Sequence, residues 1–236
     1  MDGRTNRSKR TSQNRIVIIL LAMLMLATMP MTVFASSADS LQAIADKAGC
    51  AYEDILSSKL VAPGESVSDW IAIATGCSGN PVKRNAYLKG LEEYVTAEYE
   101  QNGCLHNIKA TEYHRISLAV LALGGDPTAF GKDASGEPIN LIAEGTYNWD
   151  NSNSLGTQGL NGWIWALITI DAKYYDIPRD AIYTREDIVN AILAAQTDEG
   201  GFGLSGGSPD VDITAMALQA LASYYPQHEN VKGSVD

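Results

Sequence analysis

Two carboxylates stand two residues apart near the C-terminal end of the chain, directly before a long apolar run. Asp210 and Asp212 precede the stretch from Ile213 to Tyr225. A carboxyl group acts as a general acid only if its neighbours keep it protonated. Aspartate at a helix start also accepts hydrogen bonds from free backbone N–H groups and is favoured by the helix dipole. The pair therefore predicts an acid or a helix cap. The cap is the simpler explanation, because Glu112 holds the equivalent place one hundred residues earlier.

Soft metal ligands cluster in one segment, which contains Cys104, His106 and His114. Their spacing, Cys-x-His-x7-His, matches no zinc-site pattern. The sequence also shows no Ser-His-Asp order, and its Gly-Gly-Phe-Gly run at 200–203 has no predicted strand before it, as a phosphate-binding loop would need. We therefore expect no metal site and no cofactor.

The chain contains an internal repeat. Four similar apolar stretches begin at Trp70, Leu118, Ile164 and Leu218, so the steps between them are 48, 46 and 54 residues. A period near 50 with helical content is typical of paired-helix repeats. No stretch sustains the alternation of apolar and polar residues that a half-buried strand requires. The sequence therefore predicts an all-α fold.

Two kinds of helix alternate along the chain. One kind is amphipathic: in 81–98 the residues Tyr87, Leu91, Tyr94 and Val95 fall on one face. The other kind, such as 212–225, is apolar on every side and must be surrounded by protein. An outer ring of helices around an inner ring satisfies this alternation. We expect outer helices near 39–58, 81–98, 137–145 and 185–196, and inner helices near 67–76, 112–123, 159–172 and 212–225. Thr184 and Asp187 predict a capping box at the start of the last outer helix.

The last repeat resembles a known family. The segment Gln196-Thr-Asp-Glu-Gly-Gly-Phe-Gly203, followed by Pro209-Asp-Val-Asp-Ile-Thr-Ala215, is similar to the prenyltransferase and squalene-cyclase repeat. Ser68-Asp69-Trp70 resembles the opening of the secreted, transcobalamin-like bacterial branch. The resemblance implies an α/α toroid with six helix pairs. The sequence supplies about four, so we expect an incomplete toroid, truncated at its C-terminus.

The resemblance also implies two kinds of chemistry. Terpene cyclases of this superfamily carry Asp-x-Asp-Asp-Thr-Ala, in which the middle aspartate protonates an alkene or epoxide. Asp212 matches that proton donor and Asp210 matches the first aspartate, but Ile213 replaces the third. A transcobalamin-like relative instead implies a bound corrinoid.

A long Asn- and Ser-rich loop, residues 146–162, is expected at the mouth of the toroid cavity. Trp149 lies inside it, and Trp163 and Trp165 follow it, either as stacking surfaces for a sugar or corrinoid ring or as core residues of an inner helix. The candidate ligand-binding residues are Glu112, Tyr113, Trp149, Asn151, Asn153, Gln158, Asn161, Trp163, Asp210 and Asp212.

The N-terminal residues 1–35 form a predicted export signal. Five basic residues precede the uncharged segment 16–34, and Ala35 suits a signal peptidase. The alternative is an uncleaved membrane anchor, and either places 36–236 outside the cytosol. The net charge of −11 argues against nucleic acid and anionic lipid as partners. The three cysteines allow one disulfide bond, Cys50–Cys77 or Cys77–Cys104.

Together these patterns favour a secreted or surface-associated, non-catalytic binding module for a small molecule such as a corrinoid. Two alternatives stay open. One is an isoprenoid cyclase or prenyltransferase with Asp212 as the acid. The other is a structural spacer that contacts other domains of a longer surface protein.

Overall fold

The computed structural model describes residues 43–44, 47, 62–77, 84–150 and 153–235. The chain divides into two units, Met1–Ala48 and Gly49–Asp236, and all named helices lie in the second. The α-helices are α2 (Ser66–Cys77), α3 (Arg84–Asn102), α4 (Ala110–Ala122), α5 (Leu141–Gly145), α6 (Leu160–Asp171), α7 (Arg185–Leu193), α8 (Val211–Leu221) and α9 (Glu229–Val235), and a 3-10 helix, η1, spans Leu155–Gln158. The fold is all-α, as predicted, and the described residues include no strand.

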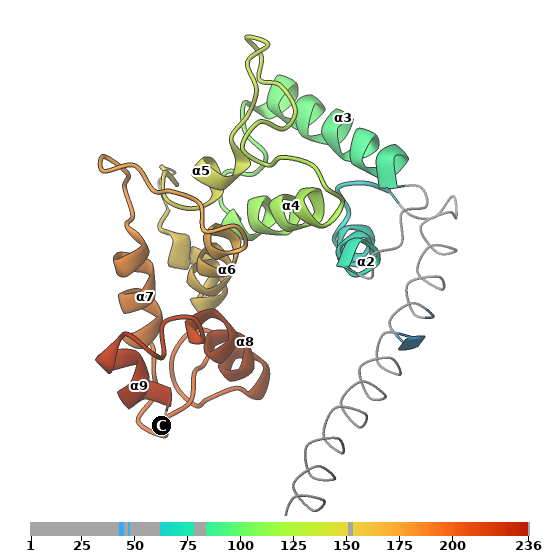
Figure 1. Cartoon of the computed structure of the whole chain (residues 1–236). Helices are drawn as coiled ribbons and strands as arrows, with labels where there is room; N and C mark the ends of the chain where they lie inside the picture. The colour runs from blue at the N-terminus through green and yellow to red at the C-terminus, as the bar shows by residue number, and fades with distance from the viewer. Residues whose placement is uncertain (1–42, 45–46, 48–61, 78–83, 151–152, 236) are drawn as a thin grey trace, which may run out of the picture. The chain divides into compact units, whose positions relative to one another are not determined.

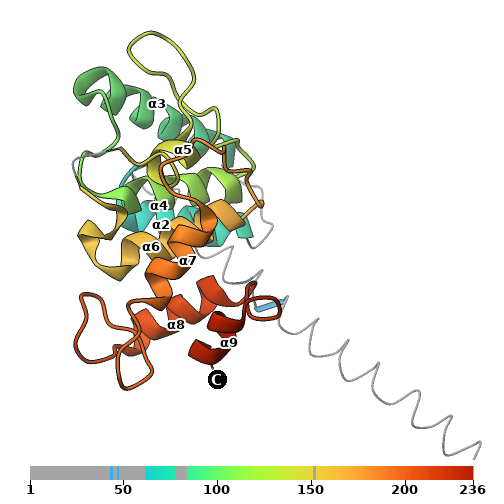
Figure 2. The same ribbon diagram turned by 90° about the vertical axis from the view of Figure 1, so that its left-hand side faces the viewer.

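The helices of the second unit lie in two layers. Helices α2, α4, α6 and α8 follow one another along an arc, each packed against the next, and α3, α5, α7 and α9 lie on its convex side (Figures 1 and 2). Helices α2, α4, α6 and α8 fall in the four ranges predicted for the inner set, and α3, α5 and α7 fall in three of the four ranges predicted for the outer set. Helix α9 is an additional outer helix. Most bounds fall within a few residues of the prediction. The leader 1–35 and the predicted outer helix 39–58 lie outside the described residues, apart from positions 43, 44 and 47.

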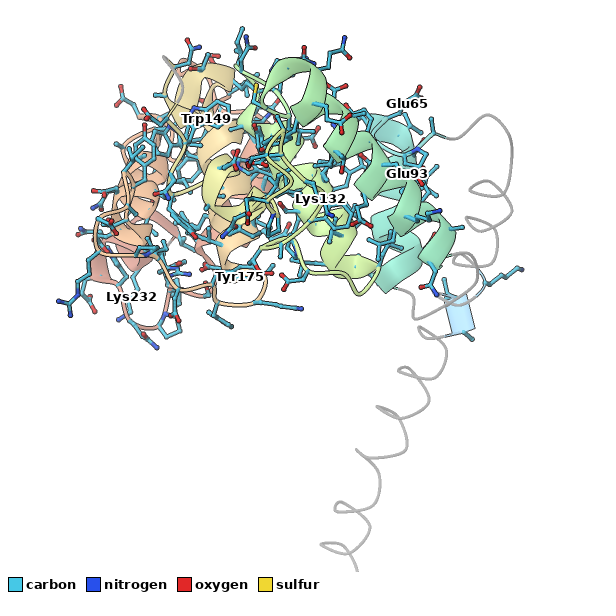
Figure 3. All side chains as sticks on the ribbon, turned by 90° about the horizontal axis from the view of Figure 1, so that it is seen from above. Glu65, Glu93, Lys132, Trp149, Tyr175 and Lys232 are labelled. Carbon is cyan, nitrogen blue, oxygen red and sulfur yellow. The ribbon has the colours of Figure 1, made fainter. Side chains whose placement is uncertain are left out.

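The distribution of apolar residues explains the layers. Helix α3 buries Tyr87, Leu91, Val95 and Tyr99, which recur every four residues, while Glu93 on its other face is exposed (Figure 3). Inner helix α4 buries residues on several sides, among them five in succession from Tyr113 to Ser117. Burying one leucine or isoleucine side chain contributes about 1.5–3 kcal/mol, so the buried residues of both layers stabilise the fold.

Side-chain caps fix where two of the helices begin. The Thr184 hydroxyl accepts a hydrogen bond from the Asp187 backbone, and the Asp187 carboxylate accepts one from the Thr184 backbone, which confirms the predicted capping box of α7. The Asp210 carboxylate accepts hydrogen bonds from the backbone N–H groups of Asp212 and Ile213 and caps α8. The cap interpretation of Asp210 is therefore confirmed.

The connection from α7 to α8 carries the family-like motif. Gln196 pairs with Phe202 in an isolated β-bridge, and its side-chain amide donates to the carbonyl oxygens of Gly200 and Ser234. Phe202 is fully buried, and its backbone N–H donates to the Thr214 hydroxyl in α8. The motif thus ties the end of an outer helix to the start of the next inner one.

Two predictions about the helices are wrong. Helix α5 covers only five residues, because the segment before it forms a hairpin-like loop in which Lys132 pairs with Pro138 and Phe130 donates to the carbonyl of Ile139. One side of α8 is exposed: Val211 is 84% and Leu218 38% accessible, and Ala215 and Ala222 are exposed too. Helix α6 packs against the opposite side of α8. In the described part of the chain, no helix covers the exposed side of α8.

A glycine allows one close helix contact. A Cβ atom on Gly145 in α5 would overlap the Cβ of Tyr113 in α4. The two helices therefore approach more closely at this point than any other residue would permit. Among the described residues, no helix is long and apolar enough to span a membrane.

Candidate ligand-binding groove

The N-terminal ends of three inner helices surround an open groove of about 510 Å³. Helices α2, α4 and α6 and the loop before α8 provide its walls. The lining residues are Ser66, Trp70, Thr111, Glu112, Arg115, Gln158, Asn161, Trp165 and Leu204. The volume lies within the range of about 300–1,000 Å³ that is usual for small-molecule sites.

Two tryptophans form the apolar part of the groove. The rings of Trp70 in α2 and Trp165 in α6 have centroids 5.1 Å apart and planes inclined by 56°. They meet because α2 and α6 both flank α4 on the arc. Trp70 keeps 40% of its surface exposed. An exposed indole beside a second one offers a ligand a large apolar surface at little cost in side-chain entropy.

Arg115 provides the only positive charge among the lining residues, and its partners hold it in place. Its Nε donates to Asp69 Oδ2 at 2.9 Å, and its Nη2 donates to the Gly64 carbonyl at 2.9 Å and to Glu112 Oε2 at 2.6 Å. Asp69 is fully buried and also accepts from the Tyr87 hydroxyl at 2.7 Å. Burial raises the pKa of Asp69, and the hydrogen bonds from Tyr87 and Arg115 oppose that rise.

The polar wall carries amide and hydroxyl groups. Gln158 Oε1 accepts hydrogen bonds from the Thr111 hydroxyl at 2.8 Å and from the Thr111 backbone N–H at 3.3 Å. This contact joins η1 to the start of α4 and occupies only the oxygen of the Gln158 amide. Asn161 Oδ1 is buried and has no hydrogen-bond partner. A buried acceptor without a donor is unusual in a protein, so a water or a ligand is expected to supply one.

The groove contains three of the predicted ligand-binding residues: Glu112, Gln158 and Asn161. Asn151 lies outside the described residues. Asn153 does not line the groove, and its backbone carbonyl accepts a 2.7 Å hydrogen bond from Trp149 Nε1.

Three of the predicted aromatic ligand-binding residues lie away from the groove lining. Trp149 (Figure 3) and Tyr113 are each only 2% exposed and pack edge to face at 5.8 Å. The Tyr113 hydroxyl accepts from the Leu105 backbone, so both side chains satisfy their polar atoms inside the core. Trp163 is half-buried, packs edge to face against Tyr183 at 5.2 Å, and does not line the groove.

The acidic pair of α8 also lies outside the groove lining. The carboxylate of Asp210 is used as the cap, and Asp212 is exposed in the first turn of the helix. Neither carboxylate therefore borders the groove.

Sequence reasoning missed five lining residues, Ser66, Trp70, Thr111, Arg115 and Leu204, and it left Trp165 open between a stacking surface and a core residue. Trp70 and Trp165 belong to apolar inner helices, where an aromatic side chain is more often part of the core. One signal was present. Both tryptophans lie at the start of the aligned apolar stretches, so the repeat brings them to similar heights in the inner layer.

The two candidate histidines have other partners. His114 is buried and its Nε2 contacts the Gly145 carbonyl at 2.6 Å, while His106 Nδ1 accepts from the backbone of Ile108 and Lys109. Cys77 and Cys104 are free and do not pair with each other, and Cys50 lies outside the described residues. The part of the chain that the structure describes contains no cluster of residues fit to hold a metal ion.

A second, smaller cavity of about 310 Å³ lies at the C-terminal ends of α6 and α8. Its charged residues are tied together: Asp171 accepts from Arg185 Nε at 2.8 Å and from the Tyr224 hydroxyl at 2.6 Å. Its lining includes no tryptophan. The larger groove is therefore the better candidate site.

No protein-family model, curated protein or solved structure matches this chain. The resemblance to the prenyltransferase and squalene-cyclase repeat thus rests on the sequence motifs alone.

Proposed function

We propose that this chain is an exported, non-catalytic binding module that holds a small molecule in the groove between α2, α4 and α6. The observation that carries the proposal is the Trp70–Trp165 pair, which leaves apolar surface open beside Glu112, Gln158 and Asn161. A surface that mixes aromatic area with a few convergent polar groups is typical of ligand sites. Export follows from the predicted leader at 1–35, and the arc of inner helices fits part of an α/α toroid.

The chemistry of the groove suits binding better than catalysis. Its carboxylate, Glu112, is paired with Arg115, and no two of the described lining residues form a nucleophile and a base in contact with each other. The transcobalamin-like resemblance makes a corrinoid one candidate ligand. No observation favours the cyclase alternative, because Asp212 is exposed and outside the groove lining.

Thermal-shift measurements on the full chain test the proposal. The ligands are hydroxocobalamin, farnesyl diphosphate, tetramethylammonium and short neutral oligosaccharides. A ligand at one hundred times its Kd stabilises the folded state by about 2.7 kcal/mol, which raises Tm by about 5–10 °C in a chain of this size. We expect one class to give a saturating rise.

Two matched variants locate the binding. Trp165→Phe changes a groove residue, and Trp163→Phe changes its neighbour two positions earlier on α6, outside the groove lining. The ligand-induced rise should shrink in Trp165→Phe and persist in Trp163→Phe. A flat response to every class, or a rise equal in both variants, would contradict the proposal.

A further inference from the structure

The positively charged guanidinium of Arg115 in the groove is already paired and has little capacity left to bind an anion. Arg115 is 6% exposed and already contacts Asp69, Glu112 and the Gly64 carbonyl. The two carboxylates and the one guanidinium leave this cluster with a net charge of −1, in a chain whose net charge is −11. Among the described residues that line the groove, a phosphate or carboxylate would meet repulsion and no available cation. Anionic ligands are therefore disfavoured.

The remaining polar groups suit an uncharged partner that carries hydroxyl groups. Asn161 Oδ1 needs a hydrogen-bond donor, and the Gln158 amide nitrogen and the Ser66 hydroxyl can donate. The Thr111 hydroxyl already donates to Gln158 Oε1, so it can only accept. A hydroxyl group serves both needs, because it donates one hydrogen bond and accepts others. Neither a pure acceptor nor a pure hydrocarbon would satisfy Asn161.

The tryptophan pair adds a requirement on shape. An indole face carries partial negative charge, so it attracts the weakly positive C–H groups of a saturated ring. With Trp70 and Trp165 inclined by 56°, the groove offers two faces rather than one flat slot. A ring with C–H groups on its faces and hydroxyls around its rim meets both the aromatic and the polar part of the groove.

We propose that the groove binds a neutral sugar, with one pyranose ring against Trp70 and Trp165 and its hydroxyls directed to Asn161 and Gln158. This inference rests on the proposed function and specifies its ligand class. The site is built to recognise hydroxyl groups, so an analogue that lacks one of them leaves Asn161 without a donor again.

Tryptophan fluorescence titrations of the full chain with cellotriose, maltotriose, chitotriose and mannotriose test the inference. At least one trisaccharide should give a saturating change. Trp165→Phe should raise its Kd about tenfold, which corresponds to roughly 1.4 kcal/mol of lost aromatic contact. Asn161→Leu should raise Kd by a similar factor, and Trp163→Phe should leave Kd within about twofold.

Each variant is first compared with the parent chain by far-UV circular dichroism. If Trp165→Phe does not fold, Trp70→Phe replaces it, because Trp70 is the more exposed member of the pair. Sugar binding that survives both the tryptophan and the Asn161 changes in folded protein would overturn the inference.

Two other outcomes separate this inference from the proposed function. If all four sugars give no change while inorganic pyrophosphate, tetramethylammonium or hydroxocobalamin saturates and depends on Trp165, the groove is a binding site but its ligand is not a neutral sugar. If nothing saturates, both the ligand class and the proposed function fail.

Discussion

Replacing Asp69 by alanine tests how the groove is held together. The Asp69 carboxylate is fully buried and joins three parts of the second unit: it accepts from Arg115 in α4, from Tyr87 in α3 and from the Gly64 backbone at 3.1 Å. Asp69→Ala removes all three contacts at once. Arg115, whose side chain is 7% exposed, then keeps only Glu112 and one carbonyl as partners.

The expected cost is large. Removing one partner of a buried ion pair costs about 3–5 kcal/mol, because the other charge stays buried without compensation. The total stability of a domain is about 5–15 kcal/mol. We therefore expect Asp69→Ala to lose about 4 kcal/mol and to unfold at a much lower urea concentration, with an unchanged slope m.

A double variant separates the charge effect from simple loss of packing. In Asp69→Ala/Arg115→Met the charge left behind is gone, so this chain should be about 1–2 kcal/mol more stable than Asp69→Ala. Lys89→Ala is the control: it breaks an ion pair whose side chains are 77% and 68% exposed, and it should change stability by less than about 0.5 kcal/mol.

Urea unfolding followed by far-UV circular dichroism measures these differences without relying on Trp70, which adjoins the mutated position. A loss below about 1 kcal/mol in Asp69→Ala would refute the reasoning, as would a double variant that is no more stable than Asp69→Ala.

Three further changes test other parts of the structure. Burial lowers the pKa of His114 to about 4, while histidine in the unfolded chain binds a proton below about pH 6.5. Urea titrations that compare the parent chain with His114→Gln should therefore show the parent losing up to about 3 kcal/mol of relative stability as pH falls from 6.5 to 4. A stability difference that stays constant with pH would contradict this. Asp210→Ala should cost about 1 kcal/mol by removing a helix cap, whereas Asp212→Ala should stay within about 0.5 kcal/mol; equal effects would count against the cap. Gly162→Ala should lower Tm, at a cost of about 1–3 kcal/mol, because a Cβ there would overlap the Leu155 carbonyl oxygen; an unchanged Tm would show that α6 and η1 can separate.

The layered arrangement could be predicted because periodicity reports burial directly. An outer helix such as α3 needs one apolar face, and its four-residue recurrence is visible in the sequence. The shortness of α5 could not be predicted in this way. Its extent depends on the pairing of Lys132 with Pro138, which is a contact between loop residues that periodicity does not describe.

The groove was only partly predictable, for a related reason. Gln158 and Asn161 stand out in sequence as polar residues beside an apolar helix. Tryptophans in apolar helices look alike, but Trp165 faces the groove, Trp163 packs on Tyr183 and Trp149 is enclosed. Which side of the arc a tryptophan faces is decided by how neighbouring helices pack, and that is set by contacts between residues far apart in the sequence.

The polar residues at the starts of the inner helices take different roles. Polar residues recur in the first turn of every inner helix: Asp69 in α2, Glu112 in α4, Asn161 in α6 and Asp212 in α8. The helix dipole favours an acidic side chain at each such position, so the sequence pattern alone cannot separate a cap from a site. The neighbours separate them. Asp69 and Glu112 share the guanidinium of Arg115, Asn161 keeps a buried acceptor without a partner, and Asp212 faces solvent. Asn161, the one member without a charge, is also the one whose polar atom lacks a hydrogen-bond donor, and this is why the groove should select a hydroxyl group rather than an anion.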